Sequence, residues 1–244
     1  MRFYRVHVEG RERVGNYTLL HYRWPYDRVE PGRFVMARAN PAPLTLDPLL
    51  ARPFSVYDYD GEIASLLLEV RGRGTALLDT AREMEVSAPL GRGFQIDASA
   101  GRAALLGGGV GVAPLKVLSR RLGELSVRHD VFLGFADAET AEVAWEFPAS
   151  YVATMDGSMG ARGTVLDAVP DLESYPVVYA CGPNPMLAAV KRAVGEGALC
   201  QLSVEERMGC GNGSCNGCVV PVLGGWYARS CIEGPVFRAE VLAW

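Results

Sequence analysis

The chain has 244 residues, of which 49% are hydrophobic and 21% charged, and its formal net charge is −4 at pH 7. This composition is typical of a globular protein of about two domains, and its interspersed charges argue against nucleic-acid binding. No apolar run approaches the ~20 residues that a membrane span needs, and the first residues resemble neither a signal peptide nor a transit peptide, so we expect a cytoplasmic location.

Residues 1–99 consist of short apolar or alternating runs separated by glycine, proline and aspartate. The runs cover residues 3–8, 17–21, 33–38, 55–59 and 63–70. Many short strands with turn residues between them are typical of an antiparallel barrel or sandwich. We therefore expect a first domain of this kind over residues 1–99.

From about Arg102, apolar runs of four to six residues alternate with amphipathic segments of helical length. The runs cover residues 103–106, 131–135, 151–154, 177–181 and 200–204. Pro114 and Pro185 each stand where the first turn of a helix tolerates proline, and apolar residues follow them at helical spacing. Five buried strands with intervening helices predict a five-stranded, doubly wound parallel sheet over residues 100–204.

The last segment, residues 205–244, is rich in glycine and cysteine, and runs at 219–222 and 225–229 suggest a hairpin. Four cysteines in it show the spacing C-x4-C-x2-C of plant-type ferredoxins with a fourth cysteine further on: Cys210, Cys215, Cys218 and Cys231. The glycines between them allow the backbone to wrap closely around a small anionic cluster. The spacing predicts a [2Fe–2S] cluster in a small C-terminal domain.

Structural zinc is the alternative for these cysteines. Zinc sites usually pair their ligands as C-x2-4-C in two separated halves, whereas three of these cysteines fall within nine residues. A chain without an export signal also gives no reason to expect disulfides. Cys200 begins a predicted buried strand, and we interpret it as a small core side chain.

Two glycine turns follow predicted strands of the parallel sheet. The first contains Gly107, Gly108, Gly109 and Gly111, and the second contains Cys181, Gly182 and Pro183. A turn of this kind before a helix can hold a pyrophosphate with backbone amides and the helix N-terminus, although a purely steric role is the alternative. Two such turns at the same edge of a parallel sheet favour a dinucleotide.

Two segments of the first domain are candidate anion holders. They are Arg52, Pro53, Phe54 and Ser55, and the turn that contains Gly74 and Thr75. Arginine and a helix-opening Gly-Thr can together bind a second pyrophosphate. A solvated loop is the alternative for Arg52.

In this order, RPFS, GRGT, GGGVGVAP, ACGPNPML and EERMGCGNGSCNGCVV with CIEGPVF resemble the ferredoxin-reductase-like flavoprotein family. More closely, they resemble the electron-transfer subunits of B-type, NAD-dependent dihydroorotate dehydrogenases. The resemblance implies an FAD-binding barrel, an NAD-binding middle domain and a C-terminal [2Fe–2S] domain. For FAD it implies Arg52, Pro53, Phe54, Ser55, Leu67, Leu68, Glu69, Gly74 and Thr75; for NAD it implies Gly107, Gly108, Gly109, Gly111, Cys181, Gly182 and Pro183.

The chain departs from the family pattern at two of these positions. Phe54 stands where the wider family has tyrosine, which keeps an aromatic face but removes the hydroxyl. Glu69 stands where many relatives have arginine, so only its backbone is expected to contact the flavin. Cys181 is the candidate for a side chain near the nicotinamide.

The implied function is electron transfer in pyrimidine biosynthesis. Electrons would leave the FMN of a catalytic partner subunit, pass through the cluster and FAD, and reach NAD⁺, in a heterotetramer with two copies of each subunit. One alternative is a subunit of an NADP-linked reductase or a hydrogenase, which residues 134–138 disfavour because no basic residue there could bind a 2′-phosphate. Another alternative is a non-enzymatic iron–sulfur carrier or redox sensor, whose glycine turns would be structural only.

Overall fold

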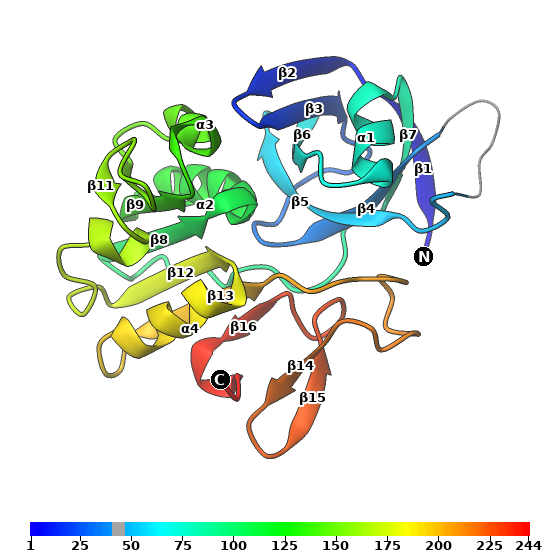
Figure 1. Cartoon of the computed structure of the whole chain (residues 1–244). Helices are drawn as coiled ribbons and strands as arrows, with labels where there is room; N and C mark the ends of the chain where they lie inside the picture. Colours follow the sequence, from blue (N-terminus) through cyan, green and yellow to red (C-terminus); the bar gives the residue numbers. More distant parts are fainter. Residues whose placement is uncertain (41–46) are drawn as a thin grey trace.

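The computed structural model of the chain describes residues 1–40 and 47–244. It has three parts, which Figure 1 shows as a curled antiparallel sheet, a parallel sheet flanked by helices, and a lobe formed by the last part of the chain. The lobe lies beside both of the other parts (Figure 1). Within the described ranges, no helix is both long and apolar enough to cross a membrane.

The first part is an antiparallel sheet in the order β1-β7-β4-β5-β6-β3-β2. Its elements are β1 (Phe3–His7), β2 (Gly10–Val14), β3 (Tyr17–Arg23), β4 (Phe34–Ala39), β5 (Arg52–Tyr59), β6 (Ile63–Glu69), α1 (Arg73–Thr80) and β7 (Glu83–Ser87). Alternate residues of a strand face the same side of a sheet. One such set, which includes Tyr22, Val35 and Leu66, packs into a single core, so the sheet curls around its own interior and confirms the predicted barrel.

The sequence patterns do not predict β2 and β7. β2 is an edge strand whose middle residues, Arg11 to Arg13, are all charged. β7 alternates Glu83 and Glu85 with Met84 and Val86, so its apolar face has only two residues before the serine that ends it. Both strands form because neighbouring strands offer unpaired backbone groups, which is a tertiary effect that no local pattern shows.

The second part is a sheet in the order β11-β10-β9-β8-β12-β13-β16. Its elements before the lobe are β8 (Arg102–Gly108), η1 (Gly109–Val112), α2 (Ala113–Glu124), β9 (Arg128–Phe135), α3 (Ala138–Ala141), η2 (Glu142–Glu146), β10 (Tyr151–Thr154), β11 (Ala161–Arg162), η3 (Val165–Ala168), β12 (Val177–Gly182), α4 (Asn184–Ala193) and β13 (Leu199–Val204). All neighbouring strands from β11 to β13 are parallel. The five predicted strands are therefore present, and the two-residue β11 extends the sheet at one edge.

Helices cover both faces of this sheet. On one face, Leu105 of β8 packs in a core with Leu115 and Leu118 of α2. On the other face, the next residue, Leu106, packs in a core with Leu187 and Val190 of α4. Strands buried on both sides explain the nearly continuous apolar runs, and the sheet is doubly wound as predicted.

The lobe contains β14 (Val219–Val222), β15 (Trp226–Arg229), β16 (Val236–Arg238) and η4 (Ala239–Val241). β14 and β15 form the predicted hairpin. β16 leaves the lobe and pairs antiparallel with β13, so part of the expected C-terminal domain belongs to the second sheet. Lys191 of α4 also donates hydrogen bonds to the carbonyl oxygens of Leu242 and Trp244 at 2.7 and 2.9 Å, which holds the end of the chain against this helix.

The winding of the sheet reverses between β8 and β12. In that register, Gly107 of β8 lies opposite Cys181 of β12, so the two glycine turns meet at adjacent strand ends. A Cβ atom on Gly111 would lie 2.6 Å from the carbonyl oxygen of Cys181, which shows how closely the two turns approach. Such a reversal point is where ligands bind in open parallel sheets.

Gly111→Ala is expected to lower the free energy of unfolding by about 1–3 kcal/mol, because the methyl group would collide with the backbone of the second turn. The thermal unfolding midpoint measures this effect. Gly123→Ala is the matched control, since a Cβ atom there, near the end of α2, meets no other atom within 4 Å. That change should stabilise the helix by about 0.5–1 kcal/mol. Equal midpoints for the two variants would contradict the close approach.

Candidate functional site

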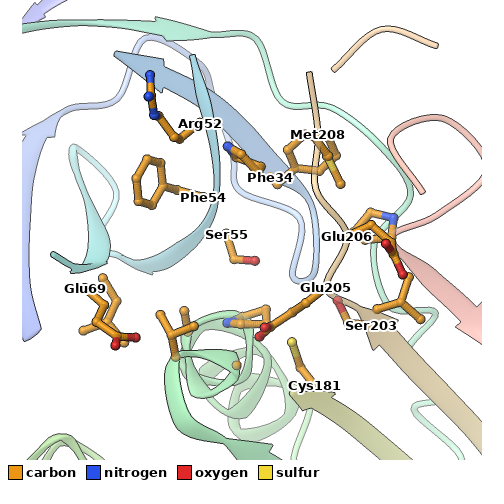
Figure 2. Close-up of a pocket in the computed structure, with 18 of the residues that line it drawn as sticks. Phe34, Arg52, Phe54, Ser55, Glu69, Cys181, Ser203, Glu205, Glu206 and Met208 are labelled. Atoms are coloured by element: carbon orange, nitrogen blue, oxygen red, sulfur yellow. The ribbon is translucent and has the colours of Figure 1, made fainter. Parts of the chain in front are cut away.

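A cavity of about 390 Å³ lies where the barrel, the parallel sheet and the start of the lobe meet (Figure 2). The predicted site residues in its wall are Arg52, Pro53, Phe54, Ser55, Leu67, Glu69, Thr75, Gly111 and Cys181. The wall also contains residues to which the sequence patterns assign no role, among them Phe34, Arg71, Ser203, Glu205, Glu206 and Met208. The fold thus brings residues of all four predicted nucleotide-binding segments to one space.

Other predicted site residues lie beside the cavity. Leu68 points into the barrel core with no exposed surface, because it alternates with Leu67 and Glu69 along β6. The remaining NAD candidates form the two turns at the ends of β8 and β12, where a Cβ atom on Gly108 would lie 3.2 Å from Cδ of Pro183. They are Gly107, Gly108, Gly109, Gly182 and Pro183.

Arg52 lies against the start of α1. A Cβ atom on Gly74 would overlap the Arg52 guanidinium, so only glycine permits this approach. The Thr75 hydroxyl accepts hydrogen bonds from the backbone N–H groups of Arg71 and Gly72 at 3.0 and 3.1 Å, which organises the first turn of the helix. A guanidinium beside a helix N-terminus is an arrangement that suits a phosphate group.

Other charged groups also line the cavity. Arg71 forms a 2.6 Å ion pair with Glu69, so a positive charge lies on this wall although residue 69 is acidic. Glu205 is an exposed residue that forms part of the cavity wall. Desolvation raises the pKa of its carboxyl group, which Arg71 opposes and Glu69 reinforces. Figure 2 shows Glu205 beside Cys181 and Ser203 at the ends of neighbouring strands.

Cys181 is almost fully buried at the end of β12. Burial, followed by the charge of Glu205, raises the pKa of its thiol, and a hydrogen bond with Ser203 opposes the shift. The thiol is therefore protonated at neutral pH. This state suits a packing and positioning role beside a ligand better than nucleophilic attack, which needs the thiolate.

The four cysteines of the lobe lie around one loop and form two pairs. The backbone N–H of Cys215 donates to Sγ of Cys210, and that of Cys231 donates to Sγ of Cys218, each at 3.4 Å. Gly211 and Gly213 have φ of 67° and 81°, which only glycine adopts without strain, and they turn the loop around the sulfurs. Four cysteines in two pairs match the number of ligands that a cluster with two irons takes.

The two pairs differ in their surroundings. Cys218 and Cys231 are buried, whereas Cys215 is exposed. Burial opposes ionisation of Cys210, but the N–H groups of Asn212, Cys215 and Ser214 lower its pKa to about 6. Among residues 1–40 and 47–244, no three His, Cys, Asp or Glu side chains are placed to hold a single metal ion.

The cysteine loop and the cavity share a layer of side chains. Cys218 and Cys231 pack in one apolar cluster with Phe34 and Met36 of β4, and Met208 packs against the same cluster. Phe34 and Met208 also line the cavity. A group in the cavity and a group on the cysteines would therefore be separated by little more than these side chains.

Comparisons with known proteins agree with this geometry. Residues 205–243 match the family model of the iron–sulfur cluster binding domain of dihydroorotate dehydrogenase B. Over 223 residues the chain is 43% identical to the electron transfer subunit of dihydroorotate dehydrogenase B (NAD⁺) from Geobacillus thermodenitrificans, covering 86% of this chain and 85% of the relative. The chain belongs to this family. The subunit of the same name from Listeria monocytogenes is 38% identical over 225 residues, covering 87% of each chain.

The chain is also similar in structure to solved flavoprotein reductases. A structure of the NADH-dependent reduced ferredoxin–NADP oxidoreductase, described in connection with flavin-based electron bifurcation, matches with a TM-score of 0.83 and 25% identity over 98% of this chain and 90% of that chain. Phthalate dioxygenase reductase matches with a TM-score of 0.61 and 16% identity over 98% and 96%, which shows a shared fold.

Family membership confirms the resemblance predicted from the motifs. The chain is an electron-transfer component of an oxidoreductase. The family model covers all four cysteines and describes an iron–sulfur domain, which favours a cluster over the structural zinc alternative. The signal for the residues that the sequence analysis missed was weak. Arg71 lies just before the GRGT motif and Glu205 opens the EERMGC segment, but neither position has a local pattern that assigns it to a cavity wall.

Proposed function

We propose that this chain passes electrons from the FMN of a dihydroorotate dehydrogenase catalytic subunit to NAD⁺ in pyrimidine biosynthesis. It would hold FAD in the central cavity and a [2Fe–2S] cluster on Cys210, Cys215, Cys218 and Cys231. The observation that carries this proposal is the layer formed by Phe34 and Met208, which lines the cavity on one side and packs with the cysteines on the other. A non-enzymatic iron–sulfur carrier would have no use for such a cavity.

The wall of the cavity suits FAD. Arg52 beside Gly74 and the start of α1 would bind the pyrophosphate with charge-assisted hydrogen bonds. Phe54 offers an aromatic face and Ser55 a hydroxyl group on the same strand, β5. Arg71 supplies a second positive charge close to the cavity.

The two turns at the ends of β8 and β12 suit the nicotinamide nucleotide. Gly107 to Gly111 lead through η1 into α2, so the start of this helical segment lies at this edge and would favour a phosphate group there. Cys181 would contact the nicotinamide as a neutral thiol. After β9 the chain continues with Ala136 and Asp137, and neither could neutralise a 2′-phosphate, which supports NAD rather than NADP.

When bound, FAD exchanges a hydride with NAD and single electrons with an iron–sulfur cluster, so it joins two-electron to one-electron chemistry. The residues of the chain supply distance and environment. Phe34 and Met208 separate the two sites with apolar atoms, while Glu205 and Ser203 hold polar groups beside Cys181.

The proposal predicts that the purified chain absorbs light as a flavin with a [2Fe–2S] cluster and oxidises NADH with ferricyanide, but not dihydroorotate. Cys215→Ser and Cys231→Ser should each lose the [2Fe–2S] signal in electron paramagnetic resonance. Both should keep FAD and NADH–ferricyanide activity, because the cavity residues are intact. With the catalytic subunit added, neither variant should support dihydroorotate-dependent NAD⁺ reduction.

Cys200→Ser is the control, since Cys200 is a buried core residue on β13 outside the lobe. It should keep the cluster and full activity. Dihydroorotate turnover by the chain alone, a colourless zinc protein, or a cluster without flavin would each contradict the proposal. The second result would favour structural zinc, and the third would favour an iron–sulfur carrier or redox sensor.

Gly74→Ala is expected to weaken FAD binding about tenfold or more. The methyl group would displace the Arg52 guanidinium, and a hydrogen bond to a charged group contributes roughly 1.5–3 kcal/mol. Fluorescence titration of the flavin-free protein with FAD measures the affinity. Gly72→Ala is matched to it, because residue 72 is extended and a Cβ atom there meets nothing within 4 Å. Loss of affinity in both variants would argue against Arg52 as the phosphate ligand.

The hairpin of β14 and β15 supports a docking site for the catalytic subunit. It begins directly after Cys218 and ends shortly before Cys231, and its tip exposes Leu223, Trp226 and Tyr227 at 64%, 75% and 70%. Exposed aromatic anchors are typical of protein interfaces. Electron entry requires the catalytic subunit close to the cysteines, so this subunit is the occupant that we propose.

Trp226→Ala should weaken association with the catalytic subunit by at least about tenfold, as expected for an interface anchor. Titration calorimetry measures the affinity, and sedimentation tests the proposed complex of two copies of each subunit. Trp145→Ala is the control, because Trp145 is equally exposed but belongs to η2 of the second part. NADH–ferricyanide activity should be unchanged in both variants. If Trp226→Ala instead altered only self-association, the occupant would be a second copy of this chain.

A further inference from the structure

Arg229 and Glu233 form an ion pair at the fourth cysteine. Nη2 of Arg229 lies 2.6 Å from Oε1 of Glu233, while Nε and the backbone N–H of Arg229 donate to Oε2 at 3.2 and 2.7 Å. One residue thus gives the carboxylate three hydrogen bonds. Both side chains are about one-third exposed, and a pair of that kind contributes little to stability on its own.

The pair also connects the two halves of the cysteine loop. Nη1 of Arg229 donates to the carbonyl oxygen of Gly213, which lies between Cys210 and Cys215, at 3.4 Å. The backbone carbonyl of Arg229 accepts hydrogen bonds from Ile232 and Glu233 at 3.0 and 2.9 Å and closes the turn that carries Cys231. Arg229 is therefore held between the segment of the first two ligands and the turn of the fourth.

Arg229 also lies two residues before Cys231, and the residue between them, Ser230, donates its backbone N–H to the carbonyl oxygen of Cys218 at 2.9 Å. The guanidinium is thus a fixed positive charge beside the buried pair of ligands. The carboxylate of Glu233 lies next to it, so the field at the sulfurs depends on both members of the pair.

We propose that Arg229 is a positioning residue that raises the reduction potential of the cluster, and that Glu233 holds it in place and partly offsets its charge. This inference rests on the proposed [2Fe–2S] function. Two ferric ions, two sulfides and four thiolates carry two net negative charges, and transfer of one electron from the partner flavin to one iron adds a third. A fixed cation nearby stabilises the more negative, reduced form, and surrounding charges and hydrogen bonds are known to set cluster potentials.

The test is a potentiometric titration of the purified chain, followed by electron paramagnetic resonance of the reduced cluster. At the wild-type midpoint, the ratio of reduced to oxidised cluster should fall about tenfold in Arg229→Gln, which corresponds to roughly 59 mV for a one-electron couple. The ratio should rise in Glu233→Gln, because a negative charge is removed. Arg229→Gln combined with Glu233→Gln should return close to the wild-type ratio, since the net charge is restored.

Iron and sulfide content is measured for every variant, so loss of the cluster is seen separately from a change in potential. If Arg229→Gln does not retain the cluster, two other variants test the charge role. Arg229→Lys should keep the reduction potential near the wild-type value, and Glu233→Gln should raise it. A shift of the same sign in Arg229→Gln and Glu233→Gln, or no shift in either, would falsify the charge role. Absence of a cluster from the wild-type chain would instead overturn the proposed function.

Discussion

Electron transfer between two bound groups weakens steeply with distance, so the contact on which this molecule depends is the packing of Cys218 and Cys231 against β4 of the barrel. Phe34 and Met36 belong to the same apolar cluster as these cysteines. A Cβ atom on Gly211 would lie 2.7 Å from Cγ of Met36, so the glycine lets the cysteine loop approach the barrel this closely. The loop glycines therefore serve two purposes, since they wrap the sulfurs and bring them to the cavity wall.

The return of the chain to the second sheet keeps this contact rigid. β16 pairs with β13, and the backbone N–H of Val204 donates to the carbonyl oxygen of Pro235 at 3.0 Å. The lobe is thus anchored where it leaves the sheet and where it comes back. A lobe tied at both ends has little freedom to move the cysteines away from Phe34, which suits a fixed electron path better than a hinged one.

The sequence patterns predicted the features that depend on residues close together in the chain. The cysteine spacing, the two glycine turns and the buried strands each depend on residues close together in the sequence. The pairing of β16 with β13 and the place of Phe34 in the cavity wall could not be predicted in this way, because the residues around them come from other parts of the chain. Gly74 is an example: the motif assigned it to a phosphate turn, but only the structure shows that a side chain there would displace the guanidinium of Arg52 from β5.

The segment after β13, residues 205–208, connects the parallel sheet to the cysteine loop. The family model starts at Glu205, the first residue after β13, and this residue lies in the cavity wall together with Ser203 of the strand. Glu206 accepts a hydrogen bond from Nδ2 of Asn184, at the start of α4 and beside the second glycine turn, at 3.1 Å. Two residues later Met208 reaches the cysteine cluster. Three of the four residues from 205 to 208 therefore touch the expected NAD edge, the cavity or the cluster, so a shift of this segment would disturb all three sites together.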